Sequence, residues 1–240
     1  WLNRLLEIFG SEDKEIRCLQ ARFLFAIDEV GDAIDLCKQL LAEIVMEVSV
    51  KSKGTASPET ASLYQRIGLT LVNFYLDEEM FDEAELLCMD LLGAADDTEV
   101  YVLLYKTYKL SGQRRAADNL YAELLGEGGI DAGNLMKLVD VLKKHRLVDE
   151  MAMATVQLKN TLPHSLRVKL YEIYRYEQKQ DKAGAMIVLK DLLARYPELS
   201  IIRTKLARHY YEVGLYQNAI ELCDSILKTE PERFDILFLK

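Results

Sequence analysis

Apolar residues recur every three or four positions along most of this chain, separated by polar residues. Near the end of the chain, Ile202, Leu206 and Tyr210 follow this spacing, Gly214 interrupts it, and a second run begins at Ala219. Such spacing places the apolar side chains on one face of an α-helix. Two runs separated by a glycine therefore predict a pair of helices joined by a short turn.

The helix pair recurs along the sequence with a period of 34 residues. Pro163, Pro197 and Pro231 are 34 residues apart, and Gly129 takes the preceding place. We call positions related by this repeat a column; one step of 33 and one of 51, a period plus a 17-residue insertion, extend the columns upstream. A small-residue column contains Ala33, Ala84, Ala117, Met151, Ala185 and Ala219; an aromatic column contains Leu24, Tyr75, Tyr108, Leu142, Tyr176 and Tyr210; an aliphatic column contains Leu40, Leu91, Leu124, Leu158, Leu192 and Ile226.

Each column has an expected role. Two antiparallel helices approach closely only where a side chain is short, which explains the small-residue column. Proline lacks an N–H and disfavours helix in the residue before it, so Pro163, Pro197 and Pro231 should end the second helix of their pairs. One hairpin cannot bury its own apolar face, so successive hairpins are expected to stack around a shared core.

The cysteines follow the same repeat. Cys37, Cys88 and Cys223 share a column with Tyr121, Thr155 and Leu189, which indicates buried packing positions. Cys18 lies one helix before Cys37 and is the one plausible disulfide partner. The chain has neither a CxxC pair nor histidines at zinc-ligand spacing, so we expect free thiols and no metal.

This pattern resembles the tetratricopeptide repeat family, whose unit is a helix-turn-helix of 34 residues. The best match runs from Ser200 to Arg233, where the residues that fit are Leu206, Ala207, Tyr210, Gly214, Tyr216, Ala219, Ile226 and Pro231. Three positions depart from the pattern: Glu172 replaces a leucine, Met151 a small residue and Lys159 an apolar one. The resemblance implies an all-α, right-handed α-solenoid of stacked helix-turn-helix repeats.

The predicted organisation is a single elongated array cut from a longer protein. Residues 1–10 are expected to be the closing helix of a preceding unit, and 49–61 an insertion in which Ser57 and Pro58 start a helix. Apolar ends without polar caps allow a homodimer as the alternative to a longer chain. The predicted repeats are 14–48, 65–97, 98–131, 132–165, 166–199 and 200–233, and 234–240 is expected to begin a further helix.

Composition narrows the class of protein. The chain has 240 residues, 50% of them hydrophobic, with 12 Gly, 4 Pro and a net charge of −9. This excludes disorder, and the negative charge argues against a general nucleic-acid-binding surface. No apolar run is long enough to cross a bilayer. We expect a cytoplasmic protein, with export to the periplasm or membrane attachment through flanking sequence as the alternative.

Candidate chemistry is sparse. His145, His164 and His209 occupy different units without a metal-binding or nucleophile motif, and are expected on the surface or in a groove. The glycines of 126–129 form no phosphate-binding pattern, and the acidic run 77–79 is expected to be a solvated turn. These observations predict no enzyme activity and no cofactor.

In the resembling family the first helix of each hairpin lines a concave surface that commonly receives a peptide. From residue 98 onward, the exposed first-helix positions carry eight basic side chains against four acidic ones, Glu99, Asp140, Glu177 and Glu212. This reverses the overall charge balance and predicts an acidic partner segment. The candidate groove contains Lys106, Lys109, Lys137, Lys143, Lys144, Arg167, Lys205 and Arg208, with Tyr171, Tyr174 and Tyr211 as candidate anchors.

The function predicted from the sequence is a non-catalytic scaffold that binds a protein or peptide. Two alternatives stay open: an architectural subunit of a secretion, envelope or other multi-subunit assembly, and the regulatory arm of a larger enzyme. An ordinary solvated face without a binding role is the competing interpretation of the groove.

Overall fold

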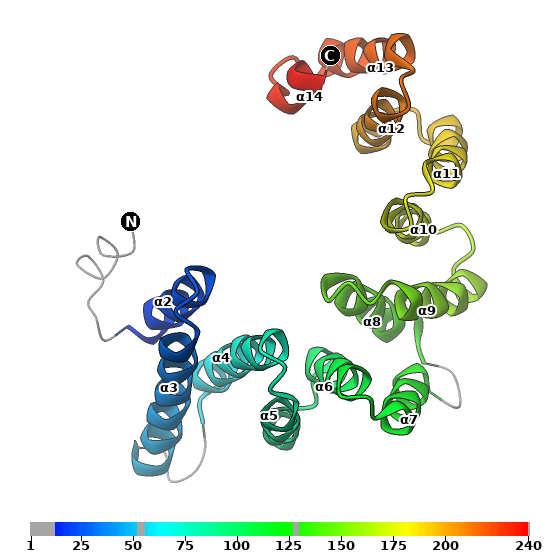
Figure 1. Ribbon diagram of the computed structural model, residues 1–240. Coiled ribbons are helices and arrows are strands. Elements are labelled where there is room, and N and C mark those ends of the chain that lie inside the picture. The colour runs from blue at the N-terminus through cyan, green and yellow to red at the C-terminus, as the bar shows by residue number, and fades with distance from the viewer. Residues whose placement is uncertain (1–12, 52–55, 127–129, 240) are drawn as a thin grey trace. The chain divides into compact units, whose positions relative to one another are not determined.

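The computed structural model describes residues 13–51, 56–126 and 130–239, and the closing helix expected in 1–10 lies outside them (Figure 1). The chain divides into two compact units: the N-terminal unit ends at Gly129 and the C-terminal unit begins at Ile130. A single continuous array was expected, so the division is a finding of the structure.

Every regular element of the described residues is an α-helix, which confirms the all-α class (Figure 1). The N-terminal unit contains α2 (Lys14–Ala26), α3 (Val30–Lys51), α4 (Pro58–Asp77), α5 (Phe81–Ala94), α6 (Thr98–Leu110) and α7 (Arg114–Leu125). The C-terminal unit contains α8 (Ala132–Lys144), α9 (Val148–Thr161), α10 (Leu166–Gln178), α11 (Lys182–Arg195), α12 (Ser200–Glu212), α13 (Tyr216–Thr229) and α14 (Phe234–Leu239).

Each even-numbered helix from α2 to α12 forms a hairpin with the helix that follows it, through a turn of one recurring geometry. The turn contains one residue with positive φ; these residues are Asp28, Glu79, Gly112, Arg146, Gln180 and Gly214. Their spacing is that of the sequence columns. Two residues ahead of the second helix, positive φ reverses the chain within a few residues, which glycine tolerates best.

The turn residues complete a Schellman motif, in which the backbone N–H after the positive-φ residue reaches back to the first helix. Leu215 donates to the Tyr210 carbonyl at 2.8 Å, and Asp181 donates to the Tyr176 carbonyl at 2.9 Å. The aromatic column therefore marks the carbonyls that accept this bond. The same bond recurs in each of the six hairpins and sets their common geometry.

Capping explains why the first helices begin where they do. Their N-termini follow linkers, and four of them have a side-chain cap: Asp13, Ser57, Asp97 and Asp131 each accept from backbone N–H groups of the first turn. Such caps satisfy donors that have no partner within the helix. Ser57 and Pro58 start α4, as predicted.

The prolines end the second helices, as predicted. α9, α11 and α13 each stop two residues before Pro163, Pro197 and Pro231. The residue before each proline still donates to the aliphatic column, as Tyr196 does to the Leu192 carbonyl at 2.8 Å, and then turns to an extended conformation.

The columns form the core. Ala33, Ala84, Met151 and Ala185 of the small-residue column are completely buried, and Ala117 and Ala219 are nearly so. The cysteine column is buried throughout, which confirms its packing role, and all four cysteines are free thiols. In the N-terminal unit a single apolar cluster runs from α2 to α6, and within it the rings of Phe25 and Phe74 stack at 4.1 Å.

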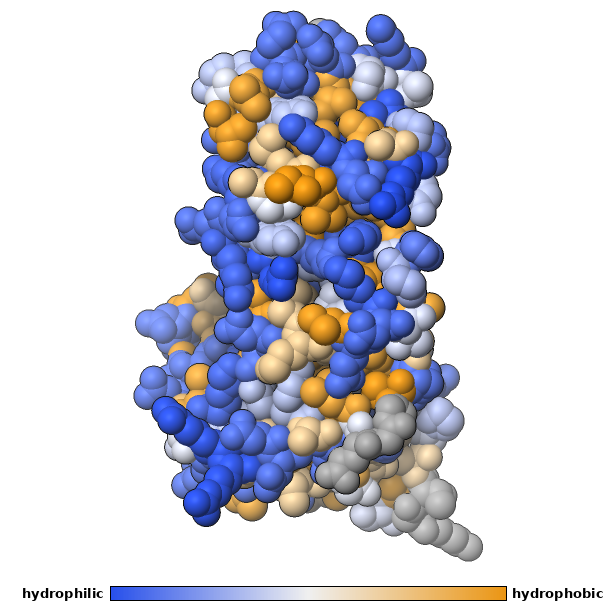
Figure 2. Space-filling view, turned by 90° about the vertical axis from the view of Figure 1, so that its right-hand side faces the viewer, coloured by the Kyte–Doolittle hydropathy of each residue, from blue (hydrophilic) through white to orange (hydrophobic). Residues whose placement is uncertain are grey.

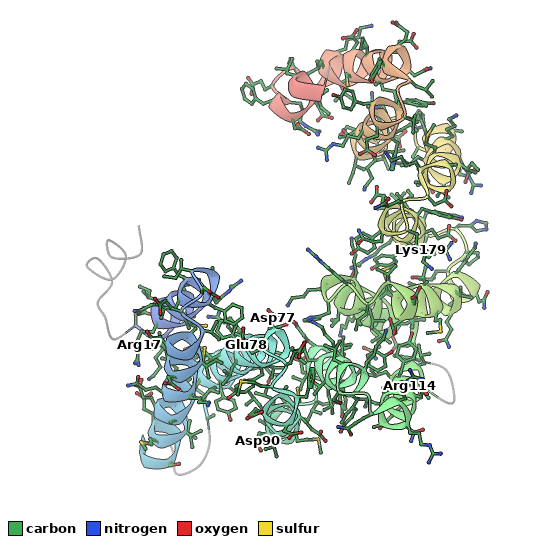
Figure 3. All side chains as sticks on the ribbon, viewed as in Figure 1. Arg17, Asp77, Glu78, Asp90, Arg114 and Lys179 are labelled. Atoms are coloured by element: carbon green, nitrogen blue, oxygen red, sulfur yellow. The ribbon has the colours of Figure 1, made fainter. Side chains whose placement is uncertain are left out.

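The insertion is largely helical. Residues 49–51 continue α3, and 58–61 form the first turn of α4, so the insertion lengthens the helices on both sides of residues 52–55. Part of the segment expected to be an inserted loop is therefore an extension of two helices. The acidic run Asp77, Glu78 and Glu79 is exposed at the α4–α5 turn, as predicted (Figure 3).

The positive-φ column predicts opposite effects of two substitutions in the C-terminal unit. Gly214 has a φ of 81°, and no heavy atom lies within 4 Å of where a Cβ would be, so Gly214→Ala adds only backbone strain. We expect its free energy of unfolding in urea to fall by about 1 kcal/mol. Gln180→Gly removes such strain and should raise the free energy by about 0.5 kcal/mol, after the entropic cost of glycine. Equal signs for the two variants would contradict the strain argument.

Candidate protein-binding surface

The predicted groove residues fall in both units. Lys106 and Lys109 lie on α6 of the N-terminal unit, so they are considered apart from the others. The other nine lie on three first helices of the C-terminal unit, which we call the first-helix face: Lys137, Lys143 and Lys144 on α8; Arg167, Tyr171 and Tyr174 on α10; Lys205, Arg208 and Tyr211 on α12.

Polar contacts join neighbouring first helices along this face. Between α8 and α10, Asp140 accepts from the Arg167 guanidinium and, at 2.5 Å, from the Tyr171 hydroxyl. Arg167 also donates to that hydroxyl at 2.8 Å. Burial and the hydrogen bond to Asp140 raise the pKa of Tyr171 to about 12. The phenol is therefore neutral at physiological pH and acts as a donor between two helices.

The next pair of first helices has a similar contact. Between α10 and α12, Glu177 Oε1 accepts from Lys205 Nζ at 2.8 Å and lies 3.4 Å from His209 Nε2. Between α12 and α14, Arg208 lies 3.9 Å from Asp235, at the limit of an ion pair. Asp140 and Glu177, two of the four acidic groove residues, are thus engaged in joining one repeat to the next.

The structure corrects two sequence expectations on this face. Tyr171 was expected as an exposed anchor, but the residue is only 3% exposed because its hydroxyl turns toward Asp140. His209 was expected on the surface or in a groove, but it is 7% exposed beside Glu177. Tyr211 is 53% exposed and Tyr174 is half-buried.

Two lysines of α8 have no carboxylate partner among the described residues. Lys137 and Lys143 are both exposed, and Lys143 Nζ lies 4.9 Å from the centre of the Tyr174 ring. A cation held over a tyrosine ring is oriented without being neutralised. The positive charge of the face is therefore concentrated on α8, next to Tyr174.

A hollow of about 480 Å³ opens between the ends of α10 and α12. Its walls include the predicted Lys205 and Arg208, together with Lys182, Glu212 and His209. Lys182 pairs with Glu212 at 3.2 Å, and the Nδ1 atom of His209 is buried without a hydrogen-bond partner in the described structure. Lys182 was missed because it begins a second helix, and the sequence analysis considered only first helices.

The two charged departures from the repeat pattern pair with each other. Glu172 on α10 accepts from Lys159 on α9 at 2.8 Å and from Lys169 at 2.9 Å. Burial alone would raise the pKa of the Glu172 carboxyl, but the hydrogen bonds from the two lysines outweigh it, so the pKa is lowered. An ion pair has taken the place of an apolar contact between consecutive repeats.

Two searches of the described residues bear on chemistry and on membranes. They contain no group of three or more His, Cys, Asp or Glu side chains arranged to hold a metal ion. Among the same residues, no helix is both long enough and apolar enough to cross a membrane.

The fold defined by these helices is that of a helical-hairpin repeat protein. No profile of a known family matches the sequence, and no curated protein matches it. A tetratricopeptide repeat protein from Parabacteroides merdae is similar in structure, at 12% identity and a TM-score of 0.42, over 90% of this chain and 79% of that one.

Two further solved structures are similar. BtubC from P. vanneervenii has 18% identity and a TM-score of 0.45, over 84% of this chain and 91% of that one. YrrB, described as a tetratricopeptide repeat protein with an unusual peptide-binding site, has 16% identity and a TM-score of 0.38, over 84% and 95%. At these identities the likeness concerns the fold alone, and the repeat architecture rests on the helices of this chain.

The Lys159–Glu172 pair predicts a pH-dependent stability. The Glu172 pKa is lowered on folding, so its contribution is complete above the unfolded pKa near 4.5 and is lost as the pH falls through the folded pKa. We expect Glu172→Gln to lower the free energy of unfolding at pH 7 by about 1–3 kcal/mol. The difference from the native chain should shrink as the pH falls below 4.5, measured by urea unfolding at several pH values.

The matched control restores the apolar character of both positions. Lys159→Leu combined with Glu172→Leu should be close to neutral, because an ion pair can be replaced by packed apolar residues at little cost. A double variant as unstable as Glu172→Gln, or a pH-independent difference, would contradict the interpretation.

Proposed function

We propose that this chain is a non-catalytic protein-interaction scaffold whose first-helix face binds an acidic segment of a partner protein. The observation that carries the proposal is the charge left on that face after its internal contacts are counted. Asp140 and Glu177 join neighbouring helices, whereas Lys137 and Lys143 have no carboxylate partner among the described residues.

The hollow between α10 and α12 supports the same partner chemistry. Three cationic side chains, Lys182, Lys205 and Arg208, line it with two carboxylates, Glu177 and Glu212. An acidic side chain entering the hollow gains from this surplus of positive charge. Tyr211 follows Arg208 by one helical turn and is exposed, so it offers an amphipathic contact beside the charged site.

The contacts between first helices support a preformed surface. Asp140 and Glu177 hold basic side chains of the following repeat in place before any partner arrives. A surface ordered in advance loses less conformational entropy on binding. The alternatives of an architectural subunit or a regulatory arm stay predictions, and so does the homodimer.

A charge-reversal experiment tests the proposal. Random peptides displayed on phage are selected on the purified chain, and a selected peptide is measured by fluorescence anisotropy. We expect acidic peptides to be enriched, because the face presents unneutralised cations. Lys143→Glu with Arg208→Glu should raise the Kd about tenfold or more and leave the helix content by circular dichroism unchanged.

The control variant has the same net charge at a different place. Lys190→Glu with Lys228→Glu reverses two exposed charges on the second helices α11 and α13 and should leave the Kd unchanged. Enrichment of peptides without acidic residues would overturn the proposal. So would equal Kd values for the two double variants.

A further inference from the structure

The three departures from the tetratricopeptide pattern meet in one place. Met151, Lys159 and Glu172 line a single hollow of about 160 Å³ between α9 and α10. Each departure replaces a small or apolar residue by a larger or charged one, and the sequence alone does not show that they are neighbours. A local break of the repeat pattern that gathers at one hollow suggests a specific role for it.

The hollow has a surplus of positive charge. Both carboxylate oxygens of Glu172 are occupied, one by Lys159 and the other by Lys169. Arg175 lines the same hollow, and no carboxylate among the described residues pairs with its guanidinium. Three cations therefore surround one carboxylate.

Arg175 is held in position by an aromatic platform. Its guanidinium carbon lies 4.8 Å from the centre of the Tyr176 ring. That ring packs against Gly184 of α11, where a Cβ would lie 2.6 Å from two ring carbons. The same column holds Glu150 and Asn218 in the neighbouring repeats, so the glycine that admits the ring belongs to this repeat.

We propose that this hollow is a second protein-binding site, which receives a carboxylate side chain of a partner segment on Arg175. The planar guanidinium matches a carboxylate with two parallel hydrogen bonds. Val156, at the rim of the hollow, is 56% exposed and offers a contact for an aliphatic residue beside the acidic one. Apolar and polar surface alternate on the face of the molecule in Figure 2.

The second site is separate from the first-helix face. The hollow between α9 and α10 and the hollow between α10 and α12 share no lining residue. Glu172 within the hollow also favours a singly charged carboxylate over a doubly charged phosphate, because its own negative charge opposes the second charge. The partner group is therefore an aspartate or glutamate side chain.

A small acidic peptide tests the site directly. The probe is N-acetyl-Ala-Glu-Leu-Ala-amide, added to the ¹⁵N-labelled chain and followed by NMR. We expect saturable shifts of the Arg175 Nε–H and the Thr155 amide, with a Kd of about 1 mM, the strength of a ligand with one charged contact. Arg175→Gln should weaken binding about tenfold, and Arg175→Lys should weaken it less.

Three controls make the result specific. The peptide with Gln in place of Glu should bind at least about tenfold more weakly. Lys190→Gln, which removes a cation 5.5 Å from the Tyr210 ring in the next repeat, should leave the Kd unchanged. The double variant Lys143→Glu with Arg208→Glu should also leave it unchanged, which separates this site from the first-helix face.

Each contrary outcome overturns the proposal. Absence of saturable shifts up to about 20 mM peptide excludes the site. Equal binding of the Glu and Gln peptides, or an unaltered Kd for Arg175→Gln, excludes the carboxylate contact. Tighter binding of the peptide with phosphoserine in place of Glu assigns the site to a phosphate instead.

Discussion

Each hairpin of this protein depends on a backbone hydrogen bond that closes its turn. The bond from Leu215 to the Tyr210 carbonyl, and its equivalents, require one residue at positive φ. Because the turn is the same each time, the second helix always begins at the same place relative to the first. The small-residue column then falls where the two helices meet, and the hairpins present equivalent apolar faces to one another.

A repeated geometry also determines where variation is tolerated. Four of the six positive-φ positions hold residues other than glycine, among them Arg146 and Gln180, so the stacked core outweighs a local cost of about 1 kcal/mol at each. Between α9 and α10, the Lys159–Glu172 pair keeps two repeats in contact after the apolar residues are lost. The repeat thus accepts charge where a partner is available across the helix interface, and this leaves chemically distinct places on an otherwise regular surface.

The sequence predicted the helices and the core because both follow from the 34-residue spacing. The proline positions and the buried cysteine column needed nothing more than that period and the rules of helix packing. The side-chain partners could not be predicted, because they depend on how consecutive repeats pack. Tyr171 was expected to be exposed, yet its hydroxyl turns to Asp140 of the preceding first helix. Glu172 and Lys159 were recognised as departures, but their pairing requires the crossing of α9 over α10.

The division into two units has a sequence correlate at the same place. Where the later repeats have Pro163, Pro197 or Pro231, the chain has glycines at 126, 128 and 129, and the N-terminal unit ends at Gly129. Proline restricts its own φ and the residue before it, so a linker that contains proline limits how the next first helix can leave the hairpin. Glycine imposes no such limit. The same column therefore ends a second helix in every case, but a proline linker restricts the start of the following repeat and a glycine linker does not.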